Sequence, residues 1–535
     1  MLAQVTEALH SPLKCGHATA EIAITQNGYF VSTEPDTLIF YYDGGELSVT
    51  VSSAETWELS GECDWCTPSV RSGENGDPIR FTVPAISEDA TEGRSTSFSI
   101  ICGSATAEII IDQKPIIRFN DPNFLKAILH NSNADLNGDR QISIKEAEAC
   151  IFLNVNPSYI GHFNGYISDM TEIKHFTNLK ELDCSDNQLS LLDVSGCTQL
   201  TDLSCSNNQL SQLDVSNNTQ LTTLSCSNNQ LSLLDVSNNT QLTTLSCSNN
   251  QLSQLDVSNN TQLEGLYCDD NQLSLLDVSN NTQLESLHCY YNQLSQLDVS
   301  DNTQLTTLYC YDNQLTLLDV SGCTQLTNLR CSNNQLSLLD VSNNTQLWYL
   351  DCYKNQLSQL DVSNNTQLGY LYCYDNQLLQ LDVSNNTQLW YLNCYKNQLS
   401  LLDVSNNTKL EGLYCYDNQL SQLDVSGCTQ LTDLFCSNNQ LTLLDVSNNT
   451  KLTTLKCGGN QLSLLDVSNN TKLGVLYCYD NQLSLLDVSG CTQLTDLSCD
   501  NNPLEKLILA ASQQYKDWYD SIVEEYPDLD IIISE

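Results

Sequence analysis

One cysteine recurs every 21 residues through more than half of this 535-residue chain. It stands at Cys184, Cys205, Cys226 and onward to Cys499, in 16 units without an insertion or deletion. A fixed period of this length predicts a solenoid, in which each unit forms one coil and contacts only its neighbours. No coil can bury its apolar side chains alone, so the core forms only where coils stack.

Each unit follows the pattern LxxLxCxxNxL, as in Leu221 to Leu231. Leu224 and Cys226 alternate with Ser225, which predicts a short strand with Leu and Cys inward and Ser outward. At ~4.8 Å per strand, the units predict a curved parallel sheet roughly 70 Å long. The second half, such as "LSQLDVSNNTQ", supplies further inward Leu and Val. We expect the repeat asparagine, Asn187 to Asn502, to turn inward and bond loop backbone groups that stacking buries.

The 21-residue unit, its strand cysteine and the return segment "LDVSNNT" resemble the internalin-type leucine-rich-repeat proteins of bacterial surfaces. The resemblance covers residues 173–509. It implies a mainly β solenoid, a leucine-rich-repeat coil of 16 turns with a parallel concave sheet. Such proteins bind very different partners through their variable positions, so the resemblance implies recognition without fixing the ligand.

The chain has 25 cysteines, of which 16 belong to this ladder. At an inward position Cys acts as a small hydrophobe, and in-register parallel strands disfavour disulfide torsions. We predict reduced, buried, unreactive ladder thiols rather than metal ligands. Cys197, Cys323, Cys428 and Cys491 replace an Asn in "SGCT" and stand too many coils apart to pair. The "CDWC" of Cys63–Cys66 lacks the strand-to-helix context of a redox motif.

The formal net charge of -45 argues against binding of nucleic acid or of an anionic membrane. Fifteen of the acids are the Asp of "LDV", from Asp193 to Asp487, which form a second ladder. Like charges at one-coil spacing repel, so local donors or bound cations are expected beside them. The plainer interpretation is a solvated acidic flank. No stretch approaches 18 apolar residues, so no membrane span is expected, and we expect a monomer.

The N-terminal part contains a duplication: "CGHATAEIAITQ" (15–26) nearly recurs as "CGSATAEIIIDQ" (102–113), 87 residues later. That spacing fits one small β-sandwich, which we assign to residues 27–117. Trp57, Trp65, "SVRSG" and "EIIIDQ" make it resemble a BACON module, an immunoglobulin-like bacterial domain proposed to bind glycans. Trp57 and Trp65 could stack on sugars, or both could be core residues. Residues 1–26 look like the tail of a preceding module, so we expect the natural start, with any export signal, to be missing.

Residues 118–172 hold "DLNGDRQISIKE", which matches the EF-hand calcium loop. The expected Ca2+ ligands are Asp135, Asn137, Asp139, Gln141 through its backbone carbonyl, Ser143 and Glu146. The helices flanking the loop are expected in "PNFLKAILH" and "IKEAEACIFL". Arg140 replaces the family's Gly at a left-handed position, which adds strain of ~1 kcal/mol and weakens binding. This segment would form a small helical cap, and residues 510–535 the rear cap, an amphipathic helix covering the end with Trp518 and Tyr519.

Five positions in each coil face outward: two before the second Leu, one before the Cys and two after it. We call these the display positions, and number the coils from coil 1 (Cys184) to coil 16 (Cys499). Early coils carry Thr, Ser and Asn there, whereas 16 of the 24 tyrosines occupy them from coil 5 onward. Tyr gives broad, stiff contact area at low entropic cost, although it also favours strands and packs on sheet faces. The predicted ligand-binding face, here the tyrosine-rich face, comprises Tyr267, His288, Tyr290, Tyr309, Tyr311, Trp348, Tyr349, Asp351, Tyr353, Lys354, Tyr370, Tyr372, Tyr374, Trp390, Tyr391, Tyr395, Lys396, Tyr414, Tyr416, Tyr477 and Tyr479.

These features predict a non-enzymatic bacterial cell-surface or secreted adhesion protein that binds a protein partner through the tyrosine-rich face. The six histidines are scattered, and repeated Asp ladders lack an asymmetric acid–base pair, so no enzyme is expected. One alternative is a glycan-binding surface protein that uses the BACON-like module or the aromatic face. A second is an adaptor or effector scaffold inside a host cell.

Overall fold

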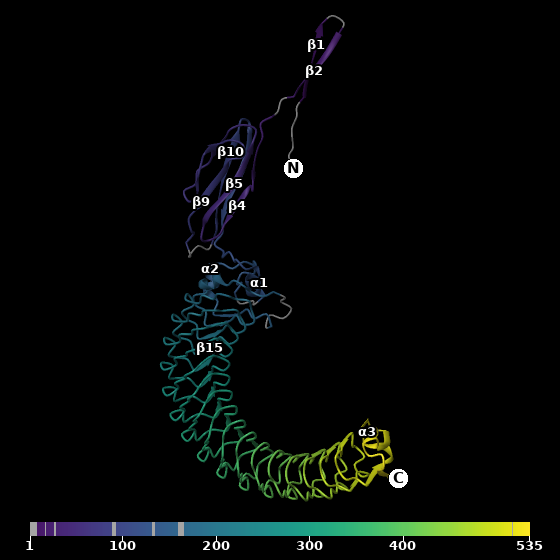
Figure 1. Ribbon diagram of the computed structural model, residues 1–535. Helices are drawn as coiled ribbons and strands as arrows, with labels where there is room; N and C mark the ends of the chain where they lie inside the picture. The colour runs from purple at the N-terminus through teal and green to yellow at the C-terminus, as the bar shows by residue number, and fades with distance from the viewer. Residues whose placement is uncertain are drawn as a thin grey trace. The chain divides into compact units, whose positions relative to one another are not determined.

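The computed structural model describes residues 8–15, 18–25, 28–87, 92–130, 134–158, 165–515 and 517–534. The chain divides into two compact units, Met1–Leu179 and Lys180–Glu535. Figure 1 shows the first unit in purple and blue and the second from teal to yellow.

The first unit contains the expected β-sandwich. One sheet has the order β4 (Thr37–Phe40), β11 (Ala105–Gln113), β10 (Arg94–Cys102), β6 (Trp57–Ser60), β8 (Ser72–Gly73). The other has the order β3 (Val31–Glu34), β5 (Gly45–Ser53), β9 (Pro78–Val83), β7 (Thr67–Pro68). Strict alternation in β5 and β9 buries every second residue between the sheets, because successive side chains point to opposite faces.

The two copies of the duplicated sequence form the same hairpin. Strand β1 (Ala8–Cys15) pairs with β2 (Ala18–Thr25) so that Cys15 opposes Ala18. In the second copy, β10 pairs with β11 so that Cys102 opposes Ala105. The register is therefore preserved across the 87-residue offset. Residues 16–17 and 26 of the first copy lie outside the described residues.

Trp57 is a core residue and not a surface platform. Its side chain is fully buried in the sandwich core, and its Nε1 donates to the Glu74 carbonyl at 2.9 Å. Trp65 packs against the same core, and the Arg94 guanidinium lies 4.4 Å from its ring centroid. The interpretation of Trp57 as a sugar-stacking platform is wrong, because its faces are occupied by the core.

The segment after the sandwich carries a helix on either side of the acidic loop, although the second helix ends at Ala149 and the remainder of the predicted helix, "CIFL", runs into a strand. Helix α1 (Pro122–His130) precedes it and α2 (Ile144–Ala149) follows it. Ser143 caps α2 in a capping box with Glu146, which fixes where the helix begins. A short strand β12 (Phe152–Asn154) and a 3-10 helix η1 (Thr171–His175) complete the unit.

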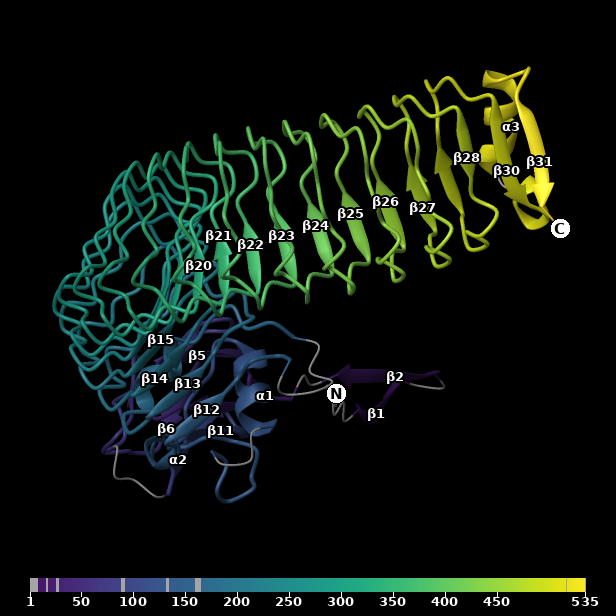
Figure 2. The ribbon, with the colours of Figure 1, turned by 90° about the horizontal axis from the view of Figure 1, so that it is seen from below.

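The second unit is the predicted solenoid, in which each coil contributes one parallel strand in register with the next. Figure 2 shows β20 to β27 side by side in chain order. The strands are β13 (Glu181–Asp183), β14 (Asp202–Ser204), β15 (Thr223–Ser225), β16 (Thr244–Ser246), β17 (Gly265–Tyr267), β18 (Ser286–His288), β19 (Thr307–Tyr309), β20 (Asn328–Arg330), β21 (Tyr349–Asp351), β22 (Tyr370–Tyr372), β23 (Tyr391–Asn393), β24 (Gly412–Tyr414), β25 (Asp433–Phe435), β26 (Thr454–Lys456), β27 (Val475–Tyr477) and β29 (Asp496–Ser498).

Two asparagine ladders join the coils, and one was predicted. On the strand side, Asn229 Nδ2 donates to the carbonyls of Cys205 and Cys226, both at 3.1 Å. On the return side, the fully buried Asn239 donates to the carbonyls of Val215 and Asn218 at 3.0 and 2.9 Å. Backbone groups buried by stacking therefore receive their donors from side chains of the next coil.

The same contacts explain the curvature of the solenoid. Strands bond directly, as where Cys226 N donates to Ser246 O at 2.8 Å, which holds coils at strand spacing. Most of the return side is bridged by the longer asparagine side chain, with only isolated backbone bridges such as Asp193 with Asp214. Figure 1 shows the resulting arc, with strands such as β15 along its inner edge.

The "LDV" aspartates are held by local donors. Asp235 Oδ1 accepts from Ser237 N at 2.9 Å, and hydrogen bonds from the Ser237 side chain and backbone lower the Asp235 pKa. The same turn recurs along the ladder, as at Asp361 with Ser363. This confirms the expectation of local donors and keeps the row ionised and exposed.

The rear cap differs from the single helix that we predicted. Helix α3 (Asp517–Glu525) buries Trp518 as expected, but it buries Ile522 rather than Tyr519, which is half-buried, and a 3-10 helix η2 (Ala511–Tyr515) precedes it. Beyond α3, β31 (Asp530–Ser534) adds to β30 (Lys506–Ala510), which pairs with β28 (Leu485–Asp487) on the return side. The apolar run "IIIS" thus extends the sheet, since a strand satisfies the edge left by the last coil.

Replacing Asn365 by Ala is expected to lower the free energy of unfolding by about 1–3 kcal/mol. The side chain is fully buried, and its loss removes the donor to the carbonyls of Val341 and Asn344, both at 2.9 Å. Asn364, which is exposed and reaches Ser342 O at 3.2 Å, is the matched control and should change little. Urea denaturation followed by circular dichroism measures both variants.

An Asn365→Cys variant sharpens this test. The chain itself places Cys428 at the equivalent position, where its Sγ lies 3.4 Å from Val404 O. The thiol is a weak donor, so Asn365→Cys should fall between the wild type and Asn365→Ala. Equal stability of Asn365→Ala and Asn364→Ala would contradict the role assigned to this ladder.

Candidate functional site

The tyrosine-rich face forms on the outward side of the strands, as predicted. Its aromatic side chains are all half-buried or exposed, with Trp348 and Trp390 exposed by 40% and 39%. Asp351 is the exception, because it is only 8% exposed. A carboxylate this deeply buried offers little surface to a ligand, so burial counts against its predicted role in ligand contact.

Many of the tyrosine rings stack on one another along the coil axis. In the position after the cysteine, Tyr353, Tyr374, Tyr395 and Tyr416 form a continuous row with centroids 4.3 Å apart and planes within 12°. Stacking at this distance occupies the ring faces and leaves mainly edges and hydroxyls for contact. The row is thus partly cross-strand packing, the alternative raised by the sequence.

The two exposed tryptophans lie two coils apart at the first display position. Between them stands Gly369, and a Cβ added there would lie 2.5 Å from Cη2 of Trp348. The Trp348 indole therefore occupies the space that a side chain at position 369 would need. The Tyr370 ring makes a T-shaped contact with this indole, with ring centroids 5.8 Å apart. Any larger residue at position 369 would displace Trp348.

Two cations at display positions lie between two aromatic rings, whereas Lys354 and Lys396 each lie over one tyrosine ring, 5.9 Å from its centroid. The Cζ atom of Arg330 lies 4.8 Å from the Tyr309 ring centroid and 4.7 Å from that of Tyr349. Lys456 lies between Phe435 and Tyr477 at 4.6 and 4.8 Å. Our sequence reasoning named neither cation. Both occupy the display position directly before the cysteine, and this shared position in the repeat could have identified them from the sequence.

Burial shifts the ionisation of several groups on the face. It raises the pKa of Asp351 to about 7, with the Tyr353 backbone and the Arg330 charge opposing the shift. Burial also raises the pKa of Tyr349 to about 12 and lowers that of His288, which is therefore neutral at pH 7. The middle of the face thus holds a carboxyl group that changes charge near neutral pH.

The sequence analysis missed a row of exposed leucines outside the strands. Leu191, Leu233, Leu275, Leu317 and Leu401 are each more than 60% exposed. They share one repeat position, where "LSLLDV" coils carry Leu and "LSQLDV" coils carry Gln. That alternation was the available signal.

In the predicted calcium loop, the side-chain oxygens of Asp135 and Glu146 accept hydrogen bonds from groups of the loop itself. Arg140 adopts φ 65°, the left-handed conformation expected at this position. Asp135 accepts from the backbone N–H groups of Gly138 and Arg140 at 2.8 and 3.1 Å. Glu146 accepts from the backbone of Leu136 and from Ser143 at 3.1 and 2.9 Å. In the described parts of the chain, no group of three or more His, Cys, Asp or Glu is arranged to hold a metal ion.

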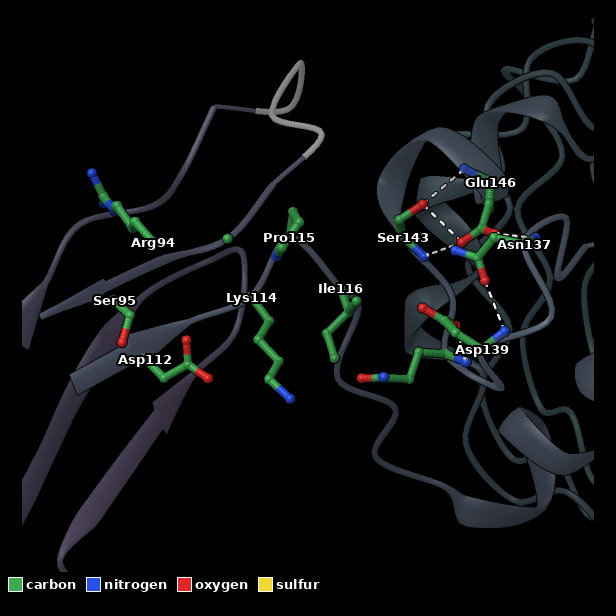
Figure 3. A pocket seen from close by; sticks show the side chains of 12 residues that line it. Arg94, Ser95, Asp112, Lys114, Pro115, Ile116, Asn137, Asp139, Ser143 and Glu146 are labelled. Atoms are coloured by element: carbon green, nitrogen blue, oxygen red, sulfur yellow. Dashed lines mark hydrogen bonds between the residues drawn. The ribbon is translucent and has the colours of Figure 1, made fainter. Parts of the chain in front are cut away.

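A cavity of about 440 Å³ separates this loop from the end of the sandwich hairpin. Asn137, Asp139, Gln141, Ser143 and Glu146, five of the six predicted ligands, line it; Asp135 does not. Figure 3 shows Lys114 and Asp112 projecting into it from the hairpin side, opposite the loop. Five of the six candidate ligands therefore line one cavity.

The ladder thiols are buried and form no disulfide with one another within the described residues. Burial raises the pKa of Cys394 to about 12 and that of Cys373 well above the ordinary value. In "CDWC", the Cys66 N–H donates to Cys63 Sγ at 3.1 Å, and burial raises the Cys66 pKa to about 12. These thiols are therefore protonated, which is the opposite of what a nucleophile or metal ligand requires.

Solved structures of several known proteins are similar to this chain. The functional domain of internalin J from Listeria monocytogenes, which includes a cysteine ladder, is 39% identical with TM-score 0.61 and covers 66% of this chain and 77% of its own. An internalin (inlF) from the same species is 26% identical with TM-score 0.51, covering 62% and 94%. The ectodomain of the Arabidopsis receptor kinase HAESA, in complex with a peptide hormone ligand, is 22% identical with TM-score 0.56, covering 68% and 69%.

No family model matches the chain, and the search of curated proteins found no match either. The fold and the cysteine ladder define a leucine-rich-repeat solenoid protein. Within that class, the chain belongs to the internalin-type proteins. None of the helices among the described residues is long and apolar enough to cross a membrane.

At pH 8, a thiol-alkylating reagent is expected to leave the ladder cysteines of the folded protein unmodified while it reacts at the half-exposed Cys63. Only the thiolate reacts, and the raised pKa keeps Cys394 protonated at that pH. Peptide mass spectrometry with and without denaturant measures the modification. Labelling of Cys394 in the folded chain as fast as Cys63 would contradict the assignment.

Proposed function

We propose that this chain is a non-enzymatic recognition protein, secreted or on the surface of a bacterium, that binds a protein partner on the tyrosine-rich face. The observation that carries the proposal is the pair of exposed indoles, Trp348 and Trp390, above rows of ordered tyrosines. Trp and Tyr dominate the energetics of protein interfaces because they bury large area with few rotatable bonds. The internalin-type fold supports the same function.

A glycan ligand is less well supported. Sugars stack on exposed ring faces, but the rings of Tyr353, Tyr374 and Tyr395 cover each other. Trp57, the other candidate platform, lies in the sandwich core. Edges and hydroxyls, with two projecting indoles, suit the side chains and backbone of a protein.

The test is selection of binders from a displayed library of random 16-residue peptides against the whole chain, with a glycan array in parallel. Changing Trp348 and Trp390 together to Ala should weaken the selected peptides by at least about 2 kcal/mol, a factor of about 30. Changing Leu233 and Leu275 to Ala is the matched control, since both are more exposed but lie outside the face. The proposal would be contradicted if the selected peptides bind the Trp348 and Trp390 double variant as tightly as the unaltered chain, or if only glycans bind.

We further propose that the loop from Asp135 to Glu146 binds Ca2+. The donors are carboxylate, amide and hydroxyl oxygens, the ligands that calcium prefers. Binding requires Glu146 to exchange its N–H donors at Leu136 and Ser143 for the ion. The left-handed Arg140 already has the backbone conformation of a bound loop.

Calcium is expected to stabilise the unit that contains the loop, by about 2.7 kcal/mol when free calcium is a hundred times Kd. The melting temperature of the unfolding transition of that unit should therefore be higher in calcium than in EDTA. Glu146→Gln should abolish the difference. Asp112→Asn, which lines the same cavity from the hairpin, is the control and should keep it. Identical melting curves of the unaltered chain in calcium and in EDTA would sink this assignment.

A further inference from the structure

Charge is distributed unevenly along the display positions. Coils 5–7 carry five carboxylates there and no Lys or Arg: Glu264, Asp269, Asp270, Glu285 and Asp312. Coils 12 and 13 carry Glu411, Asp417 and Asp433, again with no Lys or Arg. Coils 8–11 are different, because they carry three cations (Arg330, Lys354 and Lys396) against two carboxylates (Asp351 and Asp375). We call the display positions of coils 8–11 the basic window.

The basic window coincides with the exposed indoles. Trp348 and Trp390 belong to coils 9 and 11, so both lie inside it. In a chain of formal net charge -45, a local surplus of cations beside exposed Trp is a specific feature of this surface. The repeat pattern requires neither the cations nor the tryptophans at these positions, so the two features occur together independently of it.

Arg330 makes no ion pair within 4.0 Å with a carboxylate among the described residues, although the Asp351 carboxyl is near enough for the Arg330 charge to lower its pKa. The rings of Tyr309 and Tyr349 clamp its guanidinium from two neighbouring strands. Asp351 is its register partner on β21, yet no ion pair within 4.0 Å joins them. A guanidinium fixed by stacking loses little further entropy when it binds a carboxylate.

We propose that the basic window docks an acidic segment of a partner protein, with Arg330 binding a carboxylate and Trp348 and Trp390 contacting apolar side chains beside it. The inference rests on the proposed function and names the chemistry of the partner. Four coils span about 15 Å, the length of about five extended residues, so a short linear segment suffices. The acidic coils on both sides repel the same segment and so restrict it to the window.

The window's charge depends on pH through Asp351. Its carboxyl is buried and interacts electrostatically with Arg330, Tyr349, Tyr372 and, two coils before it, Asp312; one of its oxygens lacks a hydrogen-bond partner among the described residues. With its pKa raised to about 7, it loses its proton over the neutral range, so it carries more negative charge at pH 8 than at pH 6.5. Ionisation adds a negative charge beside Arg330, so an acidic ligand should bind more weakly at the higher pH. Burial lowers the pKa of His288, the histidine on β18, which moves its titration away from this range.

The experiment uses the peptides selected on the whole chain from the random 16-residue library. They are expected to be enriched in Asp and Glu, and synthetic versions with each Asp and Glu replaced by Asn and Gln should bind about tenfold more weakly. Arg330→Gln should produce a similar loss with the acidic peptides and none with their amide versions. Lys456→Gln is the matched control, since this cation is also clamped between two rings but lies outside the window. Arg330→Lys should retain part of the affinity.

Affinity of the acidic peptides is expected to fall severalfold between pH 6.5 and pH 8, and Asp351→Asn should remove that dependence. Selected peptides that need Trp348 and Trp390 but bind equally well as amide versions, or to Arg330→Gln, would overturn this inference and leave the proposed function standing. A library that yields no peptide dependent on the two tryptophans would remove both. If the glycan array shows binding of sialylated but not neutral glycans and the library yields no peptide binders, the ligand of the anion site is an acidic sugar. That result would also overturn the proposal.

Discussion

The whole architecture depends on one interaction, the asparagine side chain that donates to backbone carbonyls of the preceding coil. Stacking buries carbonyls on both sides of every coil, and each needs a donor. Asn229 supplies it beside the strand and Asn239 on the return side, each bridging two coils. A donor that must reach a fixed carbonyl one coil away tolerates no insertion, which explains why the 21-residue period is unbroken over 16 units.

Because the ladders fix the coil, the display positions are free to vary, but they vary as a group. Trp348 requires Gly369 one coil later, and Arg330 requires rings on both neighbouring strands. The stacked row from Tyr353 to Tyr416 likewise spans four coils. The unit of recognition is therefore a set of adjacent coils. The surface between coils 8 and 11 is one such set, aromatic and basic within an acidic chain.

The sequence predicted the parts of the fold that follow from periodicity. The ladder of Leu and Cys, the inward asparagine, the hairpin duplication and the left-handed Arg140 were all legible in a single chain, because each is a local or repeating constraint. The burial of Asp351 and of Trp57 was not, because it depends on which larger side chains lie on neighbouring strands. Arg330 escaped notice for the same reason: its environment consists of Tyr309 and Tyr349, which are 21 and 19 residues away. The strand of Asp530–Ser534 was missed because its partner edge exists only once the last coil is formed.

The central claim is that a partner lies on the strands of coils 8–11. Site-specific photo-crosslinking tests it most directly, with benzoylphenylalanine introduced at Tyr372 in the middle of the window or at Leu275 in the exposed leucine row. The account predicts that a bound acidic peptide forms an adduct at position 372 and none at position 275. Adducts at position 275 alone would contradict it.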